Sequence, residues 1–154
     1  MPARYAFRWS LVALILAVQA LAVYAEMPVS KDEHGVAIKG YDPVAYFLNG
    51  KPMRGNPAYE FVWQNSSWHF TSADHRDRFA AAPERYAPRY GGFCAVGLSS
   101  DVVAGADPNV FKIIDGKLYL GYDRMALKKL EGEPAGIIRK ADTNWNRRTE
   151  LAAR

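Results

Sequence analysis

The chain has 154 residues, which is enough for one domain with a hydrophobic core. Its formal net charge is +4, but the stretch from Met1 to Ala25 contains two arginines and no acidic side chain, so the remainder is nearly neutral. No cluster of lysine and arginine alternates with aromatic residues, which argues against a nucleic-acid partner. The single cysteine, Cys94, excludes an internal disulfide.

Residues 1–25 have the pattern of a secretory signal peptide. Arg4 and Arg8 precede an apolar run from Trp9 to Ala22, and small residues end the segment at Ala25. The run is shorter than the roughly 20 residues that usually cross a bilayer. We therefore expect cleavage near Ala25 and a periplasmic or secreted protein. The alternative is a membrane anchor formed by the uncleaved segment.

The first part of the exported chain is expected to be extended and then helical. Residues 26–39 are polar and show little periodicity, which predicts an extended lead-in to a domain at residues 40–146. Asp42 is a good N-cap and Pro43 suits the first helical turn, so we expect a short helix over residues 43–48.

Alternation over residues 59–71 predicts a β-hairpin that turns at Asn65-Ser66. In that register Trp63 lies opposite Trp68, and four aromatic rings share one face. His69 falls on the opposite, mixed face. The four rings belong to Phe61, Trp63, Trp68 and Phe70.

A helix is expected to follow the hairpin, from the N-cap Ser72 to about Ala82. Phe79 marks its buried stripe, and His75 lies one turn earlier on the same stripe. His75 is also in the first turn, where the helix dipole disfavours the imidazolium form. A neutral imidazole that points inward is suited to bind a metal or to act as a general base.

The only cysteine follows the only pair of adjacent glycines, in the stretch from Tyr90 through Gly91 and Gly92 to Cys94. Glycine permits tight bends and close approaches of the backbone. We therefore expect the two glycines to bring Cys94 against the helix that carries His75. The run over residues 93–98 fits either one helical turn or a buried strand, and its length does not distinguish them.

A second hairpin is predicted over residues 110–122, because Asp115-Gly116 is a preferred type I′ turn. This turn places four apolar side chains on one face, while Tyr119 and Ile114 share the other face with lysines. The four apolar residues are Phe111, Ile113, Leu118 and Leu120.

Two helices are expected to complete the chain. Asp123 can cap a helix to about Leu130, and Pro134 opens a last helix with apolar residues at helical spacing. Residues 147–154 are polar and are expected to form a fraying tail. Two hairpins and several short helices, without alternating strands and helices, predict a small single domain of the α+β class.

One short internal echo is visible, because the pattern Gly-x-Asp-Pro-x-x-aromatic occurs over residues 40–46 and again over residues 105–111. Shared turn chemistry explains this echo more simply than a duplication does.

Cys94 and His75 form the candidate metal site, with His69 as a third ligand and Asp74 as a supporting residue. Thiolate and imidazole ligands together favour copper or zinc. Because zinc usually takes four ligands, copper(I) fits two strong donors better, and zinc and iron are alternatives. Each residue also has a simpler explanation: Cys94 as a buried apolar filler, His75 as a hydrogen-bonded core residue and His69 as a solvated strand residue.

Two further hypotheses come from other classes of function. A thiolate at Cys94, activated by a nearby imidazole, could act as a nucleophile or a redox centre, although the chain has no resolving cysteine. Asp42, Asp74 or Asp107 could orient the base histidine, and the sequence does not distinguish them. Alternatively, the chain is a metal-free module that binds a small ligand or a protein, with Tyr41, Tyr46 and Tyr90 lining a pocket. Gly91-Gly92 matches no phosphate-binding spacing, so no nucleotide is expected. No catalytic residue and no oligomeric state are assigned.

Several stretches, in matching order, resemble a YHS domain. They are residues 40–47, residues 68–72, Arg76 with Phe79, and residues 83–86. From Gly40 to Trp145 the chain is more similar to the exported single-domain YHS proteins of bacteria. Those proteins share the Tyr-Gly-Gly-aromatic-Cys-Ala stretch and end in a segment like residues 140–145.

The resemblance implies a metal-associated binding protein rather than an enzyme, since short cysteine-bearing YHS domains accompany heavy-metal transport proteins. The three cysteines of those short domains correspond here to Ala45, Thr71 and His75. Two of the three ligands are therefore missing, and the third is replaced by a histidine. The metal role cannot be carried over residue by residue.

Overall fold

The computed structural model describes residues 28–152 and 154. The expected signal segment lies outside the described residues. Within those residues, no helix combines the length and the apolar character needed to cross a membrane.

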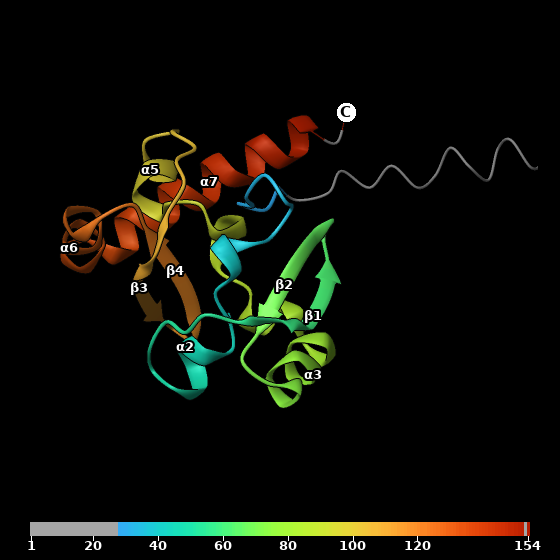
Figure 1. The fold of residues 1–154 in the computed structure, drawn as a ribbon. Helices are drawn as coiled ribbons and strands as arrows, with labels where there is room; N and C mark the ends of the chain where they lie inside the picture. The colour runs from blue at the N-terminus through green and yellow to red at the C-terminus, as the bar shows by residue number, and fades with distance from the viewer. Residues whose placement is uncertain (1–27, 153) are drawn as a thin grey trace, which may run out of the picture.

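The described chain has an α+β fold, as the sequence predicts, with two separate two-stranded antiparallel sheets among several helices (Figure 1). The strands are β1 (Asn56–Trp63), β2 (Ser66–Phe70), β3 (Asp107–Ile114) and β4 (Lys117–Gly121). The helices are α2 (Ala45–Leu48), α3 (Ala73–Ala81), α4 (Pro83–Tyr86), α5 (Ala95–Ser99), α6 (Arg124–Gly132) and α7 (Pro134–Ala152), with 3-10 helices η2 (Ile38–Gly40) and η3 (Arg89–Gly92).

The molecule contains the same hairpin–helix unit twice. In the first unit, β1, β2 and α3 run from Asn56 to Ala81, and in the second unit β3, β4 and α6 run from Asp107 to Gly132. The two units have equal element lengths and equal connections, so every boundary of the second is displaced from its counterpart by the same number of positions. The two units occupy different sides of the molecule (Figure 1).

The details inside the two units also correspond. Each hairpin has a two-residue turn and an irregular register near the start of its first strand. Each helix is capped by the side chain of the residue before it: Ser72 accepts a hydrogen bond from the backbone N–H of His75, and Asp123 accepts one from Ala126. The structure thus contains a repeat of a whole hairpin–helix unit. This repeat is different from the short pattern that occurs twice in the sequence, at residues 40–46 and 105–111.

The first hairpin turns one residue earlier than the sequence predicts. The turn is Gln64-Asn65, with φ of 48° and 52°, so Phe61 lies opposite Trp68 and Trp63 lies opposite Ser66. Positive φ at both central residues is the type I′ geometry, which asparagine tolerates. The register therefore differs by two positions from the prediction. Because the side-chain period of a strand is also two, the aromatic face is unchanged.

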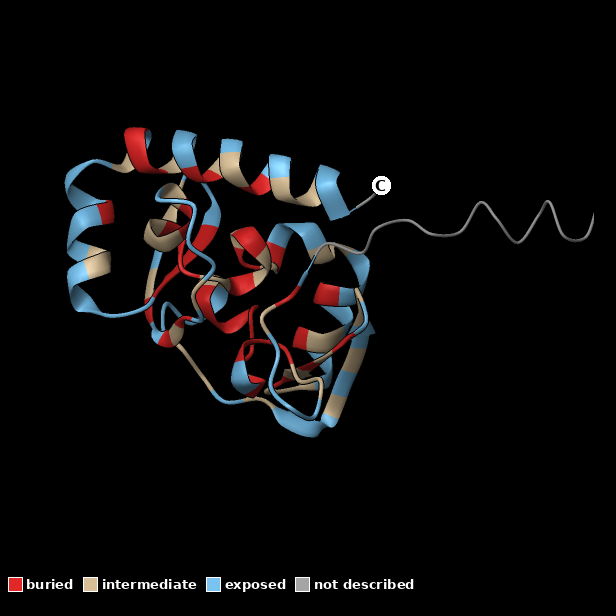
Figure 2. Cartoon of the chain, turned by 90° about the horizontal axis from the view of Figure 1, so that it is seen from above, coloured by how far each residue is buried: buried red, intermediate tan, exposed pale blue. Residues whose placement is uncertain are grey.

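The second hairpin has the predicted register, with Ile114 opposite Lys117 and Ile113 opposite Leu118. Its two faces pack into two different hydrophobic clusters: Leu118 lies in the first and Tyr119 in the second. The buried residues gather between the hairpins and helices (Figure 2). The first cluster is centred on Tyr46, Trp68, Phe70, Phe79, Leu118 and Leu120, and the second on Tyr90, Leu98, Tyr119, Leu130, Ile137 and Trp145.

Two segments are more ordered than the sequence predicts. The expected lead-in contributes Val29 and Ile38 to the first cluster, so it is part of the folded core rather than an extension in front of it. The expected fraying tail continues helix α7 to Ala152. Salt bridges from Arg147 and Arg148 to Asp101, at 2.6 and 2.9 Å, hold the last turns of this helix against the loop after α5.

Helices α5 and α6 can be compared with the sequence prediction in the same way. The run after Cys94 forms a helix, α5, rather than a buried strand, and Cys94 itself makes a parallel bridge to Leu120. Helix α6 continues to Gly132, about half a turn beyond the expected end at Leu130.

Candidate functional site

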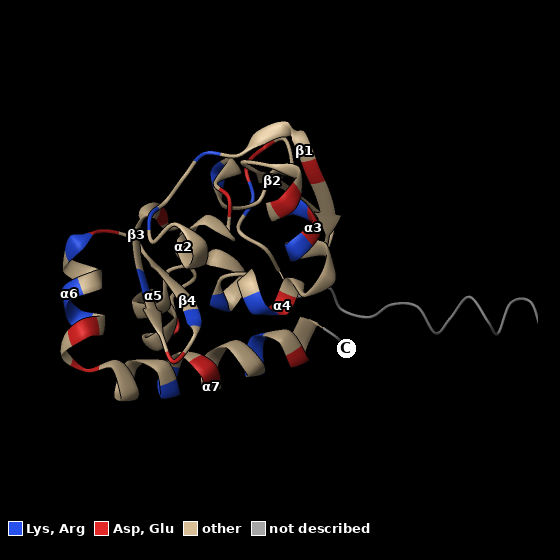
Figure 3. Ribbon diagram, turned by 90° about the horizontal axis from the view of Figure 1, so that it is seen from below, with Lys and Arg blue, Asp and Glu red and all other residues tan. Residues whose placement is uncertain are grey.

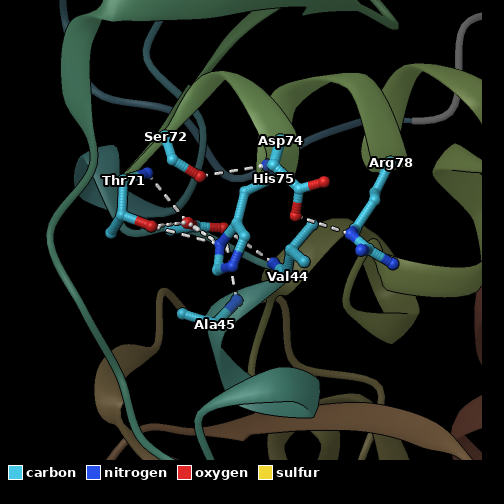
Figure 4. A network of polar contacts seen from close by, with 8 residues as sticks. Val44, Ala45, Thr71, Ser72, Asp74, His75 and Arg78 are labelled. Atoms are coloured by element: carbon cyan, nitrogen blue, oxygen red, sulfur yellow. Dashed lines mark hydrogen bonds and ion pairs between the residues drawn. The ribbon is translucent and has the colours of Figure 1, made fainter.

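A buried carboxylate, Asp42, connects three elements beside the first unit. Figure 4 labels its partners Val44, Thr71 and His75. Its Oδ1 accepts hydrogen bonds from the backbone N–H groups of Val44 at 2.8 Å and Ala45 at 3.3 Å, at the start of α2. Its Oδ2 accepts from both the backbone N–H and the hydroxyl of Thr71, each at 2.8 Å. The same oxygen lies 2.6 Å from His75 Nδ1.

This arrangement explains why Asp42 and His75 can both be buried. The carboxylate is fully enclosed, and a buried charge is tolerated only when it is paired and fully hydrogen-bonded. The network joins the start of α2, the end of β2 and the first turn of α3. His75 is therefore an inward-facing, hydrogen-bonded residue of the core, held in one orientation by Asp42.

Cys94 lies in a different part of the molecule. It precedes α5, and its Sγ accepts a hydrogen bond from the backbone N–H of Gly97 at 3.4 Å. Helices α3, which carries His75, and α5 lie on different sides of the fold in two views (Figures 1 and 3). Among the described residues, no hydrogen bond joins Cys94 to a histidine. The structure does not bring the two principal candidates together.

The remaining candidates pair with side chains other than His75 and Cys94. His69 pairs with Glu60 across the first hairpin, with 3.7 Å between His69 Nε2 and Glu60 Oε2. Asp74 is exposed and forms a salt bridge with Arg78 at 2.7 Å, one turn along α3. The Arg78 guanidinium lowers the pKa of the Asp74 carboxyl below its ordinary value. His34 is exposed, beside Glu33.

A protein metal site needs several donor side chains within reach of one ion. In the part of the chain that the structure describes, no group of three or more histidine, cysteine, aspartate or glutamate side chains is arranged to hold a metal ion. A site made of Cys94, His75 and His69 therefore stays a prediction from the sequence.

The adjacent glycines have a different role from the one expected. Gly91 has φ of 61°, and a Cβ there would collide with the backbone of Pro28. Gly92 has φ of 86°, and its Cβ would lie 2.6 Å from a methyl group of Ile38. The glycines thus permit the N-terminal segment to pass closely over this turn, rather than bringing Cys94 to α3.

Tyr90 anchors the same turn to helix α7. Its hydroxyl donates hydrogen bonds to Asp142 Oδ1 at 2.9 Å and to the Ile138 carbonyl at 3.4 Å. Burial and the neighbouring Asp142 carboxylate raise the pKa of the Tyr90 hydroxyl. Tyr46, buried in the first cluster, donates to the Pro108 carbonyl at 2.8 Å. Tyr90 and Tyr46 therefore hold elements together and do not line one common pocket.

An open groove of about 600 Å³ lies beside α6, and Cys94 is part of its lining. Small residues make up much of its surface, and Tyr122 and Met125 stand at its edge with 64% and 72% of their surfaces exposed. The lining residues are Cys94, Val96, Gly97, Ala104, Tyr122, Asp123, Met125, Ala126, Lys128 and Lys129.

Two lysines give the groove a positive edge. The ammonium groups of Lys128 and Lys129 have no ion pair or hydrogen bond with any described residue, whereas Lys112 near the same helix pairs with Glu131 at 2.7 Å. The acidic residue of the lining, Asp123, is engaged in capping α6 through a 2.8 Å bond from Ala126. The groove thus combines an apolar lining with two cations that no described side chain neutralises.

In the first unit, the end of β2 and the first turn of α3 meet at a junction that Asp42 closes. The groove lies at the corresponding junction of the second unit. Tyr122 and Ala126 occupy the positions of Thr71 and His75 in the repeat. In the first unit, Thr71 and His75 bind Asp42 and close the junction. In the second unit, Tyr122 and Ala126 leave the corresponding space open.

No single motif in the sequence marks this groove. Its floor is formed by small residues from two distant stretches, and only the assembled fold places Gly97 and Ala104 opposite α6. The one local signal is Met125, an apolar residue on the exposed face of a capped helix.

Comparison of the chain with protein-family models, with curated proteins and with solved structures finds no match. The resemblance to YHS domains stays a prediction from the sequence.

Proposed function

We propose that the chain is an exported binding protein whose groove between α5 and α6 takes an aliphatic molecule with a carboxylate at one end. The observation that carries this proposal is the pairing of an apolar groove of about 600 Å³ with two lysines that have no partner among the described residues. Ligand sites in proteins are typically apolar clefts of this size with a few polar groups that fix orientation.

The shape and chemistry of the lining favour an acyl chain. Cys94, Gly97, Ala104 and Ala126 present no bulky groups to the groove, so a slender chain can lie along them. Each methylene that leaves water contributes about 0.8 kcal/mol. The carboxylate end would lie toward Lys128 and Lys129, where exposed charges add a smaller, salt-sensitive contribution.

In this proposal Cys94 is a small apolar residue of the groove. It is buried, and none of the three histidines lines the groove with it. Activation of the thiol by an imidazole, which the thiol-enzyme hypothesis requires, therefore has no support from the geometry.

Calorimetric titration with decanoate and with 1-decanol tests the proposal. We expect decanoate to bind more tightly than 1-decanol, because only decanoate carries the charge. Substitution of both Lys128 and Lys129 by glutamine should weaken decanoate binding about fivefold and leave 1-decanol binding unchanged. Lys140→Gln on α7, away from the groove, is the matched control and should change neither. Absence of decanoate binding would contradict the proposal.

A second candidate function is the binding of a soft or borderline metal ion such as copper, favoured by one observation. Asp42 Oδ2 lies 2.6 Å from His75 Nδ1, and a carboxylate that orients a histidine in this way is typical of metal sites. His75 Nε2 would then be the ligand atom. Metal analysis of the exported protein and of the variants His75→Ala and Cys94→Ala tests this candidate, and equal metal content in all three would exclude those residues as ligands.

A further inference from the structure

Helix α6 is a peripheral element with little of its surface buried. It lies at the outer edge of the molecule in two perpendicular views (Figures 1 and 3). Of its nine residues, Leu130 is the one that is buried. Tyr122, just before the N-cap, and Met125, in the first turn, are both exposed and stand at the edge of the groove. Large apolar side chains therefore face solvent where α6 borders the groove.

A second group of exposed apolar side chains borders the same groove. Val102 and Val103 are 54% and 46% exposed, and they directly precede Ala104, which lines the groove. The backbone N–H of Val102 donates at 2.9 Å to the carbonyl of Gly97, another lining residue. Single exposed apolar residues need no explanation, but a group of them on neighbouring elements marks a contact surface for another molecule.

The charges of α6 determine which molecule this surface suits. Arg124, Lys128 and Lys129 form no ion pair or hydrogen bond with any described residue. The acidic residue of the helix, Glu131, is already paired with Lys112. The helix therefore carries an excess of positive charge at the outer edge of the molecule (Figure 3). Apolar side chains beside several unpaired cations are typical of helices that lie on an anionic lipid surface.

A second copy of the chain fits the same surface less well. Pairing around a twofold axis places the same residues of both copies against each other. The lysines of one copy would then lie near the lysines of the other, and like charges across an interface are unfavourable. An anionic bilayer carries the opposite charge, and its apolar interior accepts exposed apolar side chains.

We propose that the rim of the groove docks onto an anionic lipid bilayer, so that the groove opens toward the acyl chains. The rim consists of Val102, Val103, Tyr122, Met125, Lys128 and Lys129. Tyr122 and Met125 would enter the interface, where aromatic side chains are favoured, and the lysines would contact lipid phosphates. The inference rests on the proposed function for the purpose of this contact, because fatty carboxylates reside mainly in membranes.

Lipids with bromine atoms on their acyl chains test the contact directly, because bromine quenches the fluorescence of a tryptophan that it touches. Met125→Trp places a tryptophan on the rim, and Val62→Trp places one at a similarly exposed site on β1, in the first unit. The exported protein is used after the expected cleavage at Ala25, with phosphatidylglycerol vesicles and no decanoate. We expect brominated vesicles to quench about half of the fluorescence added at position 125 and none of that added at position 62.

The role of the lysines is measured by co-sedimentation of the protein with unbrominated vesicles. Each basic side chain at an anionic surface strengthens binding about fivefold, so substitution of both Lys128 and Lys129 by glutamine should weaken binding about twentyfold. Lys31→Gln, at the turn of the first hairpin, removes the same kind of charge far from the rim and should change binding less than twofold. Phosphatidylcholine vesicles should bind the unsubstituted protein at least tenfold more weakly than phosphatidylglycerol vesicles.

Four outcomes would overturn the inference. Brominated lipid does not quench Met125→Trp; or it quenches both tryptophan variants equally; or anionic and neutral vesicles bind the protein equally; or the protein sediments as a dimer that Met125→Lys dissociates, which would make a second copy the occupant of the rim.

The titration with decanoate separates this inference from the proposed function. Decanoate binding without vesicle binding would overturn the membrane contact and leave the proposed function standing. Quenching at position 125 without any decanoate binding would support the membrane contact and contradict the proposed function.

Discussion

The two hairpin–helix units have the same sequence of strands and helix, but the junction between hairpin and helix is closed in the first unit and open in the second. In the first unit, Asp42 reaches the end of β2 and the first turn of α3, where it binds Thr71 and His75. In the second unit, the corresponding residues are Tyr122 and Ala126, and they border an open groove. A polar network closes one junction, whereas the other, bordered by Tyr122 and Ala126, is open.

The comparison shows how corresponding junctions of a repeat can be closed in one unit and open in the other. A buried carboxylate with several hydrogen bonds fixes the position of α2 against α3. At the second junction, helix α5 is instead held by contacts with α7, including a 2.8 Å bond from Asn144 to the Leu98 carbonyl. The groove can therefore remain open without loss of the fold.

The largest expected effect is the loss of the closed junction. Asp42→Ala leaves the N–H groups of Val44 and Thr71 without this acceptor and removes the partner of His75. We expect the free energy of unfolding in urea to fall by about 3–5 kcal/mol, the usual effect of breaking a buried charged network.

The matched control for this variant is Asp74→Ala, on the helix that the network holds. Asp74 is exposed and pairs with Arg78, and such surface pairs contribute little. Its effect should be far smaller than that of Asp42→Ala. Similar effects of the two substitutions would show that the Asp42 network does not stabilise the first unit.

The next effect concerns the segment that connects the two units. Gly91→Ala introduces a Cβ that collides with the backbone of Pro28, and it also imposes a positive φ on alanine. Gly116→Ala imposes a similar φ, 71°, but its Cβ would have no neighbour within 4 Å. We expect Gly91→Ala to destabilise by about 2 kcal/mol more than Gly116→Ala in chemical denaturation, which isolates the contribution of the close approach. Equal losses would mean that the N-terminal segment does not need to lie against the glycine turn.

A substitution that fills the open junction should separate binding from stability. Ala126→Leu places a larger apolar side chain in the groove, at the position that His75 holds in the first unit. We expect decanoate affinity to fall more than tenfold while the free energy of unfolding changes by less than about 1 kcal/mol. The calorimetric titration and a urea denaturation curve measure the two quantities. Unchanged affinity would exclude the groove as the decanoate site.

The smallest effect concerns the C-terminal turns of α7, which lie against the Asp101 loop that leads to the second unit. Arg147 and Arg148 lower the pKa of the Asp101 carboxyl below its ordinary value. A lowered pKa in the folded state contributes stability above the ordinary pKa, and this contribution is lost as the pH falls through the folded value. Wild type should therefore be slightly more stable than Asp101→Asn at pH 7, and the difference should close below about pH 4.

Asparagine is a suitable replacement at this position because Asp101 has φ of 61°, a conformation that asparagine tolerates. Thermal unfolding at several pH values measures the difference. A gap that is as large at pH 3 as at pH 7 would show that the charge of Asp101 is not its source.

Much of the fold follows from local sequence signals. Asp115-Gly116 sets the second hairpin in its observed register, and Ser72 and Asp123 mark the starts of α3 and α6. The turn of the first hairpin is misplaced by one residue because Gln64 gives no signal for a positive φ. The tail is predicted to fray because its pairing with Asp101 joins residues that are distant in the sequence.

The repeat and the groove could not be predicted for a different reason. Over residues 56–86 and their counterparts, only Pro57 and Pro83 are identical, so the similarity lies in element lengths and caps rather than in residue types. The inward orientation of His75 is correctly predicted from helical periodicity. The sequence does not single out its partner among three candidate aspartates, because Asp42 also has the local signal of a helix cap, and it fulfils both roles at once.

The most direct test of the account is an NMR measurement of the protein with decanoate, in which through-space contacts between ligand and protein protons are recorded. We predict contacts from the decanoate methylene protons to the methyl groups of Ala104 and Ala126, which both line the groove. Contacts confined to residues outside the groove, or no contacts at a saturating ligand concentration, would contradict the claim that the open junction of the second unit is a binding site.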